Sequence, residues 1–180
     1  MKVESELIAR AQAGDSSAQE ALVRQFSPMV FRLISRFFRT REDVEDLAQS
    51  VFLKMFSRLD QVRPDENFPG WLSRVTVNTC YDELRKVRRQ KIALETYGPL
   101  EVKEPVVAPV EPELFSKARL ALESLDPKLR IPFVLKEVDE MSVKEIARNM
   151  GLTQTNVKVR LFRARKKLAA MLGESREANQ

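Results

Sequence analysis

Apolar side chains recur at three- and four-residue spacing along most of the chain, with polar positions between them, which is the period of an amphipathic helix. The two-residue alternation typical of strands is nearly absent, and only 5 of the 180 residues are glycine. The pattern therefore predicts an all-α fold. Helices are expected over about residues 5–13, 17–26, 28–39, 41–59, 68–91, 113–125, 128–138, 142–150 and 154–172.

Polar and small residues mark where several of these helices begin and end. Ser142 followed by Glu145 is the pattern of a capping box, in which each side chain accepts a hydrogen bond from the backbone N–H of the other residue. Gly151 can take the left-handed conformation that ends a helix. Ser27 and Pro28 predict a break, with the serine as N-cap and the proline at the first position of a new helix. The stretch 141–172 is thus predicted as two helices joined by a tight turn.

The second helix of this pair is strongly basic between its apolar positions. From 158 to 167 it contains no acid and six cations: Lys158, Arg160, Arg163, Arg165, Lys166 and Lys167. Such self-repulsion favours a polyanionic partner, with a solvated helix face as the alternative. In a helix-turn-helix the start of the second helix enters the major groove of DNA. The residues expected near base edges or phosphates are Thr155, Asn156, Lys158, Val159, Phe162 and Arg163, with Arg160 on a phosphate or in a structural role.

A second basic block ends the helix predicted at 68–91. The polar run 60–67 contains Pro64 and is expected to be a loop, and the aromatic residues Phe68 and Trp71 follow it. Residues 85–91, RKVRRQK, then hold five cations. Cations near aromatic faces suit single-stranded nucleic acid, whereas a solvated helix end is the alternative. Trp71 taken alone favours a core position.

An acidic cluster opens the helix predicted at 41–59. Its carboxylates either complement the positive end of the helix dipole or form a surface for a partner, and sequence physics leaves the two equally open. A metal-dependent nuclease site is a third hypothesis, weakened by the lack of a second acidic cluster. The residues concerned are Glu42, Asp43, Glu45 and Asp46.

Charge and proline divide the chain into parts. Residues 61–91 carry 7 basic against 4 acidic side chains, 92–126 carry 3 against 7, and 127–180 carry 12 against 6. The prolines and glutamates within 92–112 predict a flexible, acidic, Pro-rich linker. The expected organisation is two small helical domains, 1–91 and 113–173, the second a helix-turn-helix, followed by a tail at 174–180. Two basic blocks separated by an acidic one suit contact with nucleic acid at two places.

Composition excludes several classes of function. The chain has no histidine and one cysteine, which removes a disulfide framework, most zinc sites and the commonest general base. That cysteine, Cys80, lies in an apolar stripe and is expected to be a core residue rather than a nucleophile. No cofactor and no metal are expected. Because the chain shows neither a long apolar run nor a signal-like N-terminus, the expected location is the cytoplasm.

Three longer blocks follow one another in a specific order. They are DVEDLAQSVF at 43–52, FPGWLSRVTVNTCYDELR at 68–85 and, after the Pro-rich segment, LESLDPKLRIPFVLKEVDEMSVKEIARNMGLTQTNVKVRLFRARKKL at 122–168. Together they resemble the sigma-70 family of transcription initiation factors, and more narrowly its two-domain extracytoplasmic-function (ECF) group. The resemblance covers about residues 5 to 172. It implies a factor that recruits RNA polymerase to promoters and helps open the duplex, and that catalyses nothing itself.

The resemblance also implies three sets of site residues. The set expected to bind core polymerase, through the clamp helices of the β′ subunit, is Asp43, Glu45, Asp46, Leu47, Gln49 and Phe52. The set expected at the −10 element, with a loop at 60–68 that captures a flipped base, is Arg63, Asn67, Phe68, Trp71, Asn78, Asp82, Arg85, Arg88 and Arg89. The set expected at the −35 element is Thr155, Asn156, Lys158, Val159, Arg160, Phe162 and Arg163. The implied partners are the β′ and β subunits of core RNA polymerase and promoter DNA.

The chain departs from the family pattern at the start of the recognition helix. Many members have a Gly-Thr pair where this chain has Thr155 and Asn156, and a small polar residue where it has Val159. This departure bears on which −35 sequence is read. The long N-terminal extension and third domain of housekeeping sigma factors have no counterpart in the sequence, so an anti-sigma factor covering both domains is the expected form of control.

Two other functions compete with this interpretation. One is an autonomous helix-turn-helix regulator that uses 141–172, with residues 1–91 for dimerisation or sensing. The other is a nucleic-acid enzyme, whose metal-dependent activity substitutions at Asp43 and Asp46 would abolish.

Overall fold

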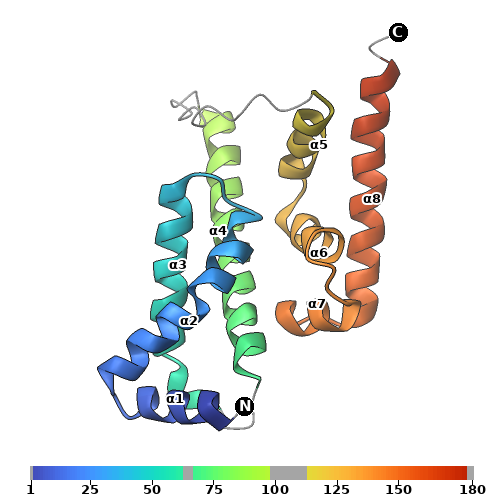
Figure 1. The fold of residues 1–180 in the computed structure, drawn as a ribbon. Helices are drawn as coiled ribbons and strands as arrows, with labels where there is room; N and C mark the ends of the chain where they lie inside the picture. Colours follow the sequence, from blue (N-terminus) through green and yellow to red (C-terminus); the bar gives the residue numbers. More distant parts are fainter. Residues whose placement is uncertain (1, 63–66, 98–112, 178–180) are drawn as a thin grey trace. The chain divides into compact units, whose positions relative to one another are not determined.

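The computed structural model describes residues 2–62, 67–97 and 113–177, and its regular elements in these ranges are all helical (Figure 1). The chain divides into two compact units, 1–80 and 81–180. The first contains α1 (Lys2–Gln12), α2 (Ser16–Ser35), α3 (Arg41–Phe56), the 3₁₀ turn η1 (Leu59–Gln61) and the start of α4 (Phe68–Tyr97). The second contains the rest of α4, then α5 (Glu113–Ser124), α6 (Pro127–Glu137), α7 (Val143–Met150) and α8 (Gln154–Glu177). The predicted all-α fold is confirmed for these described ranges.

The core of the first unit joins α2, α3 and the start of α4. Phe26 meets Phe68 edge to face, with ring centroids 5.0 Å apart, so α2 contacts α4. Lys54 donates a hydrogen bond of 3.2 Å from Nζ to Thr79 Oγ1, which links α3 to α4. The largest fully buried side chains of this unit are Leu22, Val30, Ile34, Val51, Met55, Phe68, Leu72 and Val77. Through these contacts, one side of α3 and one side of α4 pack into the core, and the opposite side of each helix stays exposed.

Helix α2 runs without a break through Pro28, so the prediction of a new helix at Ser27 and Pro28 was wrong. A proline inside a helix lacks one N–H donor and costs about 3 kcal/mol. The Ser27 hydroxyl donates to the Val23 carbonyl oxygen at 2.6 Å, one turn earlier. One buried stripe continues on both sides of the proline, and its burial offsets the cost because each large apolar side chain contributes about 1.5–3 kcal/mol. The buried residues of α2 are Ala18, Leu22, Phe26, Val30, Leu33 and Ile34.

The N-terminus of α2 is capped by Asp15, although Ser17 and Glu20 also form a capping-box pattern in the sequence. The Asp15 carboxylate accepts hydrogen bonds from the backbone N–H groups of Ser17 at 2.9 Å and Ala18 at 3.2 Å. Arg10 donates to the same carboxylate at 2.6 Å. The bond from Arg10, followed by that from Ala18, lowers the pKa of Asp15. An ionised N-cap with a cation beside it is a stronger acceptor than a serine hydroxyl.

The second unit packs α8 against α5, α6 and α7. Two predicted signals are confirmed here: Ser142 and Glu145 form the capping box of α7, and Gly151 ends α7 with φ of 63°. Asp126 caps α6. The left-handed glycine lets the Leu152 N–H donate to the carbonyl oxygen of Ala147, at 2.8 Å. A buried cluster joins α5, α6 and α8 through Ala121, Leu125, Leu129, Ala164 and Leu168.

Two helices extend beyond their predicted ends. Helix α4 continues to Tyr97 instead of ending near residue 91, because 92–97 contain good helix formers and the first proline is Pro99. The predicted linker 92–112 therefore begins inside α4, and its remainder, 98–112, lies outside the described residues. Helix α8 passes through Gly173 to Glu177, since a single glycine costs about 1 kcal/mol without breaking a helix. Within the described ranges, no helix is both long and apolar enough to cross a membrane.

Candidate nucleic-acid and partner interfaces

The acidic cluster lies along the exposed side of α3. Thr40 caps this helix, and its hydroxyl accepts a hydrogen bond from the Asp43 N–H at 3.0 Å. Arg41 pairs with Glu45 at 2.6 Å across one turn, and this bond raises the pKa of Arg41. Asp43, Glu45, Asp46 and Gln49 are all exposed, so their side chains are available to a partner. Carboxylates in the first turn also suit the helix dipole, so the two functions of the cluster are compatible.

Two of the six residues predicted to bind polymerase belong to the core instead. Leu47 is 7% exposed and Phe52 is 9% exposed, so they pack α3 onto the unit and cannot lie on its outer surface. Leu53, which the prediction omitted, is 64% exposed. It follows Gln49 by four residues and Asp46 by seven, which places it on the same stripe of the helix. The available signal was that Leu53 falls outside the three- and four-residue spacing of the buried positions.

The predicted −10 residues at the start of α4 have mainly structural contacts. Asn67 Oδ1 accepts a hydrogen bond from the Gly70 N–H at 3.1 Å, the geometry of an N-cap. A Cβ on Gly70 would lie 3.1 Å from Asn67 Nδ2, so glycine permits this close approach. Phe68 is 1% exposed and packs between Phe26 and Trp71, the latter ring stacked at 5.6 Å. Phe68 is therefore a core residue and cannot present its ring to a base.

The beginning of the predicted base-capture segment is fixed by α1. Gln12 Nε2 donates to two backbone carbonyl oxygens, that of Leu59 at 2.7 Å and that of Val62 at 3.1 Å. Sequence reasoning missed Gln12, because the partners lie about fifty positions away and are backbone atoms. Residues 63–66, including the predicted Arg63, lie outside the described residues.

The remaining −10 residues form an exposed polar and basic face on α4. Asn78, Asp82, Arg85 and Arg89 follow one another at spacings of four, three and four, which puts them on one side of the helix. All four are exposed, as is Arg88. The Arg85 guanidinium lies over the Tyr81 ring, 5.5 Å from its centroid. The face thus combines cations with an aromatic ring.

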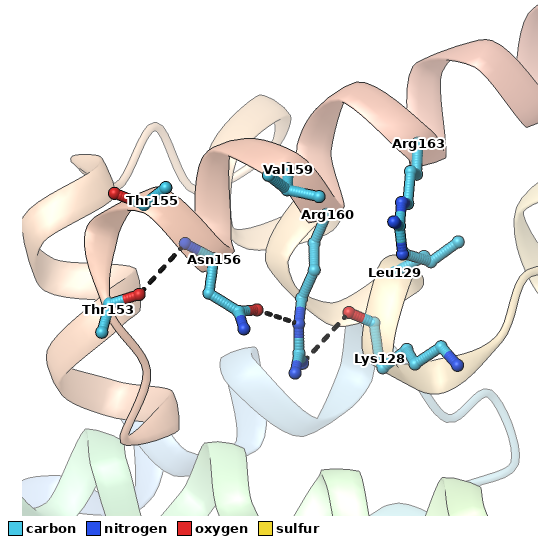
Figure 2. A pocket seen from close by; sticks show the side chains of 8 residues that line it. All are labelled: Lys128, Leu129, Thr153, Thr155, Asn156, Val159, Arg160 and Arg163. Carbon is cyan, nitrogen blue, oxygen red and sulfur yellow. Dashed lines mark hydrogen bonds between the residues drawn. The ribbon is translucent and has the colours of Figure 1, made fainter.

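A hollow of about 480 Å³ opens beside the start of α8 (Figure 2). Its lining contains three cations and no acid, and consists of Lys128, Leu129, Thr153, Thr155, Asn156, Val159, Arg160 and Arg163. Five of the seven predicted −35 residues are therefore brought together at this place. The other two, Lys158 and Phe162, are exposed elsewhere on the helix, Phe162 by 67%. The contribution of α6 was missed, because local sequence does not tell which helix packs beside the start of α8.

Hydrogen bonds fix the polar groups of this hollow (Figure 2). The Thr153 hydroxyl accepts from the Asn156 N–H at 3.2 Å and so caps α8. Arg160 donates from Nε to Asn156 Oδ1 at 2.7 Å, and from Nη1 to the Lys128 carbonyl oxygen at 3.5 Å. The positive end of α8 and the cations around it create a positive potential, so the hollow suits an anion such as phosphate.

Comparisons with known proteins agree with this geometry. Residues 22–90 match the model of Sigma-70 region 2, and residues 116–168 match that of Sigma-70 region 4. The chain is 34% identical to the ECF RNA polymerase sigma-E factor of Escherichia coli K12, over 88% of each chain. The chain belongs to the sigma-70 family, in its ECF group. Its general function is promoter recognition for RNA polymerase. The acidic face of α3 and the basic face of α4 fall within the region 2 match, and all residues that line the hollow beside α8 fall within the region 4 match.

Other relatives of this sigma factor extend the comparison. It is 32% identical to the ECF RNA polymerase sigma factor SigE of Mycolicibacterium smegmatis, over 89% of this chain and 65% of that one. Its fold resembles that of CnrH, solved in complex with the cytosolic domain of CnrY, with a TM-score of 0.61, 27% identity and coverage of 94% and 97% of the two chains. It also resembles RpoE of Bartonella quintana, solved with the anti-sigma factor NepR, with a TM-score of 0.61, 21% identity and coverage of 86% and 96%. The helical fold is that of sigma factors.

Proposed function

We propose that this sigma factor docks on core RNA polymerase through the exposed side of α3, reads a −35 element with the start of α8, and reads and opens a −10 element with α4 and the segment before it. The observation that carries the proposal is the separation of charge: an acidic face on α3 within the region 2 match, and a cationic hollow at the predicted recognition helix. The proposed domains are 1–91 and 113–173, joined by 92–112, and the proposal assigns the chain no catalytic step.

The polymerase-binding surface combines acids with one exposed apolar side chain. Asp43, Glu45, Asp46 and Gln49 supply charge and hydrogen-bond acceptors, and Leu53 supplies an apolar centre. Charge complementarity governs encounter and register, whereas a desolvated apolar contact contributes to affinity. The proposed partner surface is the clamp helices of the β′ subunit, with further contacts to the β subunit.

The −35 contact uses the exposed side of α8. Arg163 and Lys128 border the hollow and can reach phosphates or base edges, and Lys158 lies on the opposite flank of the helix from Arg160, where it can reach the other strand. Phe162 is an exposed ring that can meet a thymine methyl group in the major groove.

The proposed −10 contact combines the segment before α4 with the basic face of α4. Extruding a base costs a few kcal/mol of stacking and pairing, so a capture site needs fixed ends. Gln12 holds the backbone at Leu59 and Val62, and Asn67 caps the start of α4, so the described residues on either side of 63–66 are held by hydrogen bonds. The face that contains Arg85 and Arg89 can then follow the displaced strand.

Regulation by an anti-sigma factor belongs to the same proposal. Its support is the fold shared with RpoE of Bartonella quintana, which was solved in complex with an anti-sigma factor. Such a partner would compete with polymerase or DNA for the exposed faces described above.

Co-elution with sigma-free core RNA polymerase tests the proposal. Wild-type protein is expected to co-elute, and Asp46→Arg is expected to remain separate because the substitution reverses the charge of an exposed position on α3. Glu6→Arg is the matched control, a charge reversal at an exposed position of α1 that should leave association intact. If the wild-type protein does not bind core polymerase but binds duplex DNA tightly by itself, the result would favour an autonomous helix-turn-helix regulator instead.

A further inference from the structure

Asn156 and Arg160 form a pair of side chains one turn apart at the start of α8. Arg160 Nε lies 2.7 Å from Asn156 Oδ1. A guanidinium only donates hydrogen bonds, so the amide atom that faces it must be the oxygen. Arg160 is half-buried whereas Asn156 is exposed, so the less mobile partner determines how the amide is turned.

Arg160 is itself held by a backbone group of α6. Its Nη1 lies 3.5 Å from the Lys128 carbonyl oxygen, and Figure 2 shows the guanidinium between the Asn156 amide and that carbonyl. The backbone of Asn156 is fixed as well, because its N–H donates to the Thr153 hydroxyl at 3.2 Å. The amide is therefore oriented through its backbone and through its oxygen before any DNA arrives.

This orientation limits what Asn156 can recognise. An asparagine that reads adenine uses both amide atoms, accepting from N6 and donating to N7. Arg160 occupies one of the two lone pairs of Oδ1, so adenine N6 must compete with the guanidinium for this oxygen, whereas the Nδ2 group, which only donates, can meet a base directly. Guanine presents two neighbouring acceptors, O6 and N7, in the major groove, and so fits a side chain that mainly donates better than adenine does.

We infer that Arg160 is a positioning residue that makes Asn156 act mainly as a hydrogen-bond donor, and that guanine is preferred over adenine at the base that faces Asn156. The inference rests on the proposed −35 function of α8 and adds a specificity determinant to it.

The test measures base preference position by position. Holoenzyme reconstituted from the full chain and core polymerase is mixed with promoters in which each base of the −35 element is varied singly, and relative occupancy is determined by sequencing the bound fraction. The position read by Asn156 is the one whose preference disappears in Asn156→Ala. Wild type should favour guanine there, and Arg160→Ala should raise adenine relative to guanine by about fivefold or more, because the freed amide oxygen can accept from adenine N6.

Two further variants separate positioning from other roles. Arg160→Lys keeps a donor near Asn156 Oδ1 and should retain the guanine preference. Asn156→Asp keeps a partner for Arg160 but removes the Nδ2 donor, so it should lose the preference while its thermal unfolding midpoint stays that of wild type. Arg160→Ala and Arg160→Lys are compared with wild type by the same unfolding measurement.

Several outcomes would overturn the inference. The first is a uniform loss of occupancy in Arg160→Ala with an unchanged base profile, which would make Arg160 a phosphate contact. The second is a wild-type preference for adenine at the Asn156 position. The third is a base profile of Asn156→Ala that equals that of wild type. In each case the holoenzyme still selects −35 sequences, and the proposed function survives. A wild-type holoenzyme that selects no −35 sequence at all would instead refute the proposed function, and the inference with it.

Discussion

Arg165 of α8 donates a hydrogen bond of 2.6 Å to Glu137 Oε1 at the end of α6. The two side chains are 57% and 40% exposed, so solvent screens the pair and its contribution is at most about 1 kcal/mol. The bond nevertheless links α8 to α6 and occupies the Arg165 guanidinium. Lys166, the next residue, is exposed on the side of α8 away from the buried positions Leu161, Ala164 and Leu168. Neighbouring cations of one basic run therefore have different roles.

The first prediction separates these roles by salt. Removing one cation that binds a DNA phosphate should reduce the slope of log affinity against log salt by about 0.9. Lys166→Ala is expected to reduce the slope of promoter binding by the holoenzyme by about this amount, with an unchanged free energy of unfolding. Arg165→Ala is expected to leave the slope unchanged and to lower the free energy of unfolding by up to about 1 kcal/mol. Equal reductions of slope in the two variants would show that Arg165 leaves Glu137 for a phosphate.

The second prediction concerns the exposed leucine of α3. Leu53→Ser should change the free energy of unfolding by less than about 0.5 kcal/mol, since the side chain is 64% exposed. Its affinity for core polymerase should fall roughly tenfold or more, because an apolar contact at an interface centre is worth upwards of about 1.4 kcal/mol. Titration of labelled sigma factor with core polymerase, together with urea denaturation, measures both quantities.

Leu47→Ala is the contrasting variant for this prediction. Leu47 is 7% exposed, so truncation should cost about 2–5 kcal/mol of folding free energy. Leu47→Ala should weaken polymerase binding only in proportion to the fraction of the chain that it unfolds. Full affinity in Leu53→Ser would remove Leu53 from the proposed interface.

Sequence signals that act over a few residues predict the structure correctly. The capping box of Ser142 and Glu145 and the left-handed Gly151 appear as predicted, because each depends on atoms within one turn of the helix. The break predicted at Pro28 is wrong, because a buried stripe that spans the whole of α2 outweighs the local preference of proline. Local rules predict helix ends well when no tertiary packing opposes them.

Membership of a face was harder to predict than membership of a helix. Phe68, Leu47 and Phe52 were assigned to contact surfaces and are buried, since apolar residues in a binding motif also form the core that shapes it. Lys128 and Gln12 were missed, because their contacts are with backbone atoms or helices distant in sequence. The hollow beside α8 depends on how α6 packs against α8, and no local pattern encodes that.

The third prediction follows from the pKa of Glu145. The hydrogen bonds from Ser142, side chain first and then backbone, lower the pKa of Glu145 below its ordinary value of 4.5. A carboxyl group with a lowered pKa in the folded state stabilises the protein above its unfolded-state pKa, and this contribution disappears as pH falls through the folded-state pKa. Glu145→Gln should therefore be less stable than wild type at pH 7, by less than about 1 kcal/mol because the group is exposed.

Urea denaturation at pH 7 and at several values below pH 4.5 checks this prediction. The difference between wild type and Glu145→Gln should shrink as the pH falls, since the wild-type carboxylate becomes protonated and neutral like the glutamine. Glu123→Gln, an exposed glutamate on α5 outside any capping box, is the control for the general effect of removing a charge. A constant difference across the whole pH range would mean that the ionised carboxylate does not stabilise the cap.

The fourth prediction concerns the reactivity of Cys80. Its side chain is fully buried, and burial raises the pKa of the Cys80 thiol to about 12, although a backbone hydrogen bond and the nearby Lys54 act in the opposite direction. At pH 7 only roughly one thiol in 10⁵ would then be the reactive thiolate, and reagent reaches it only when the core opens. A thiol reagent such as DTNB should therefore label the native protein slowly, at a rate that rises with denaturant. Ser57→Cys in a Cys80→Ala background places a thiol at an exposed position and should react at the rate of a free peptide thiol. Native Cys80 that reacts as fast as this control would show that the α3 and α4 core opens readily, and that the surfaces it holds in place are not preformed.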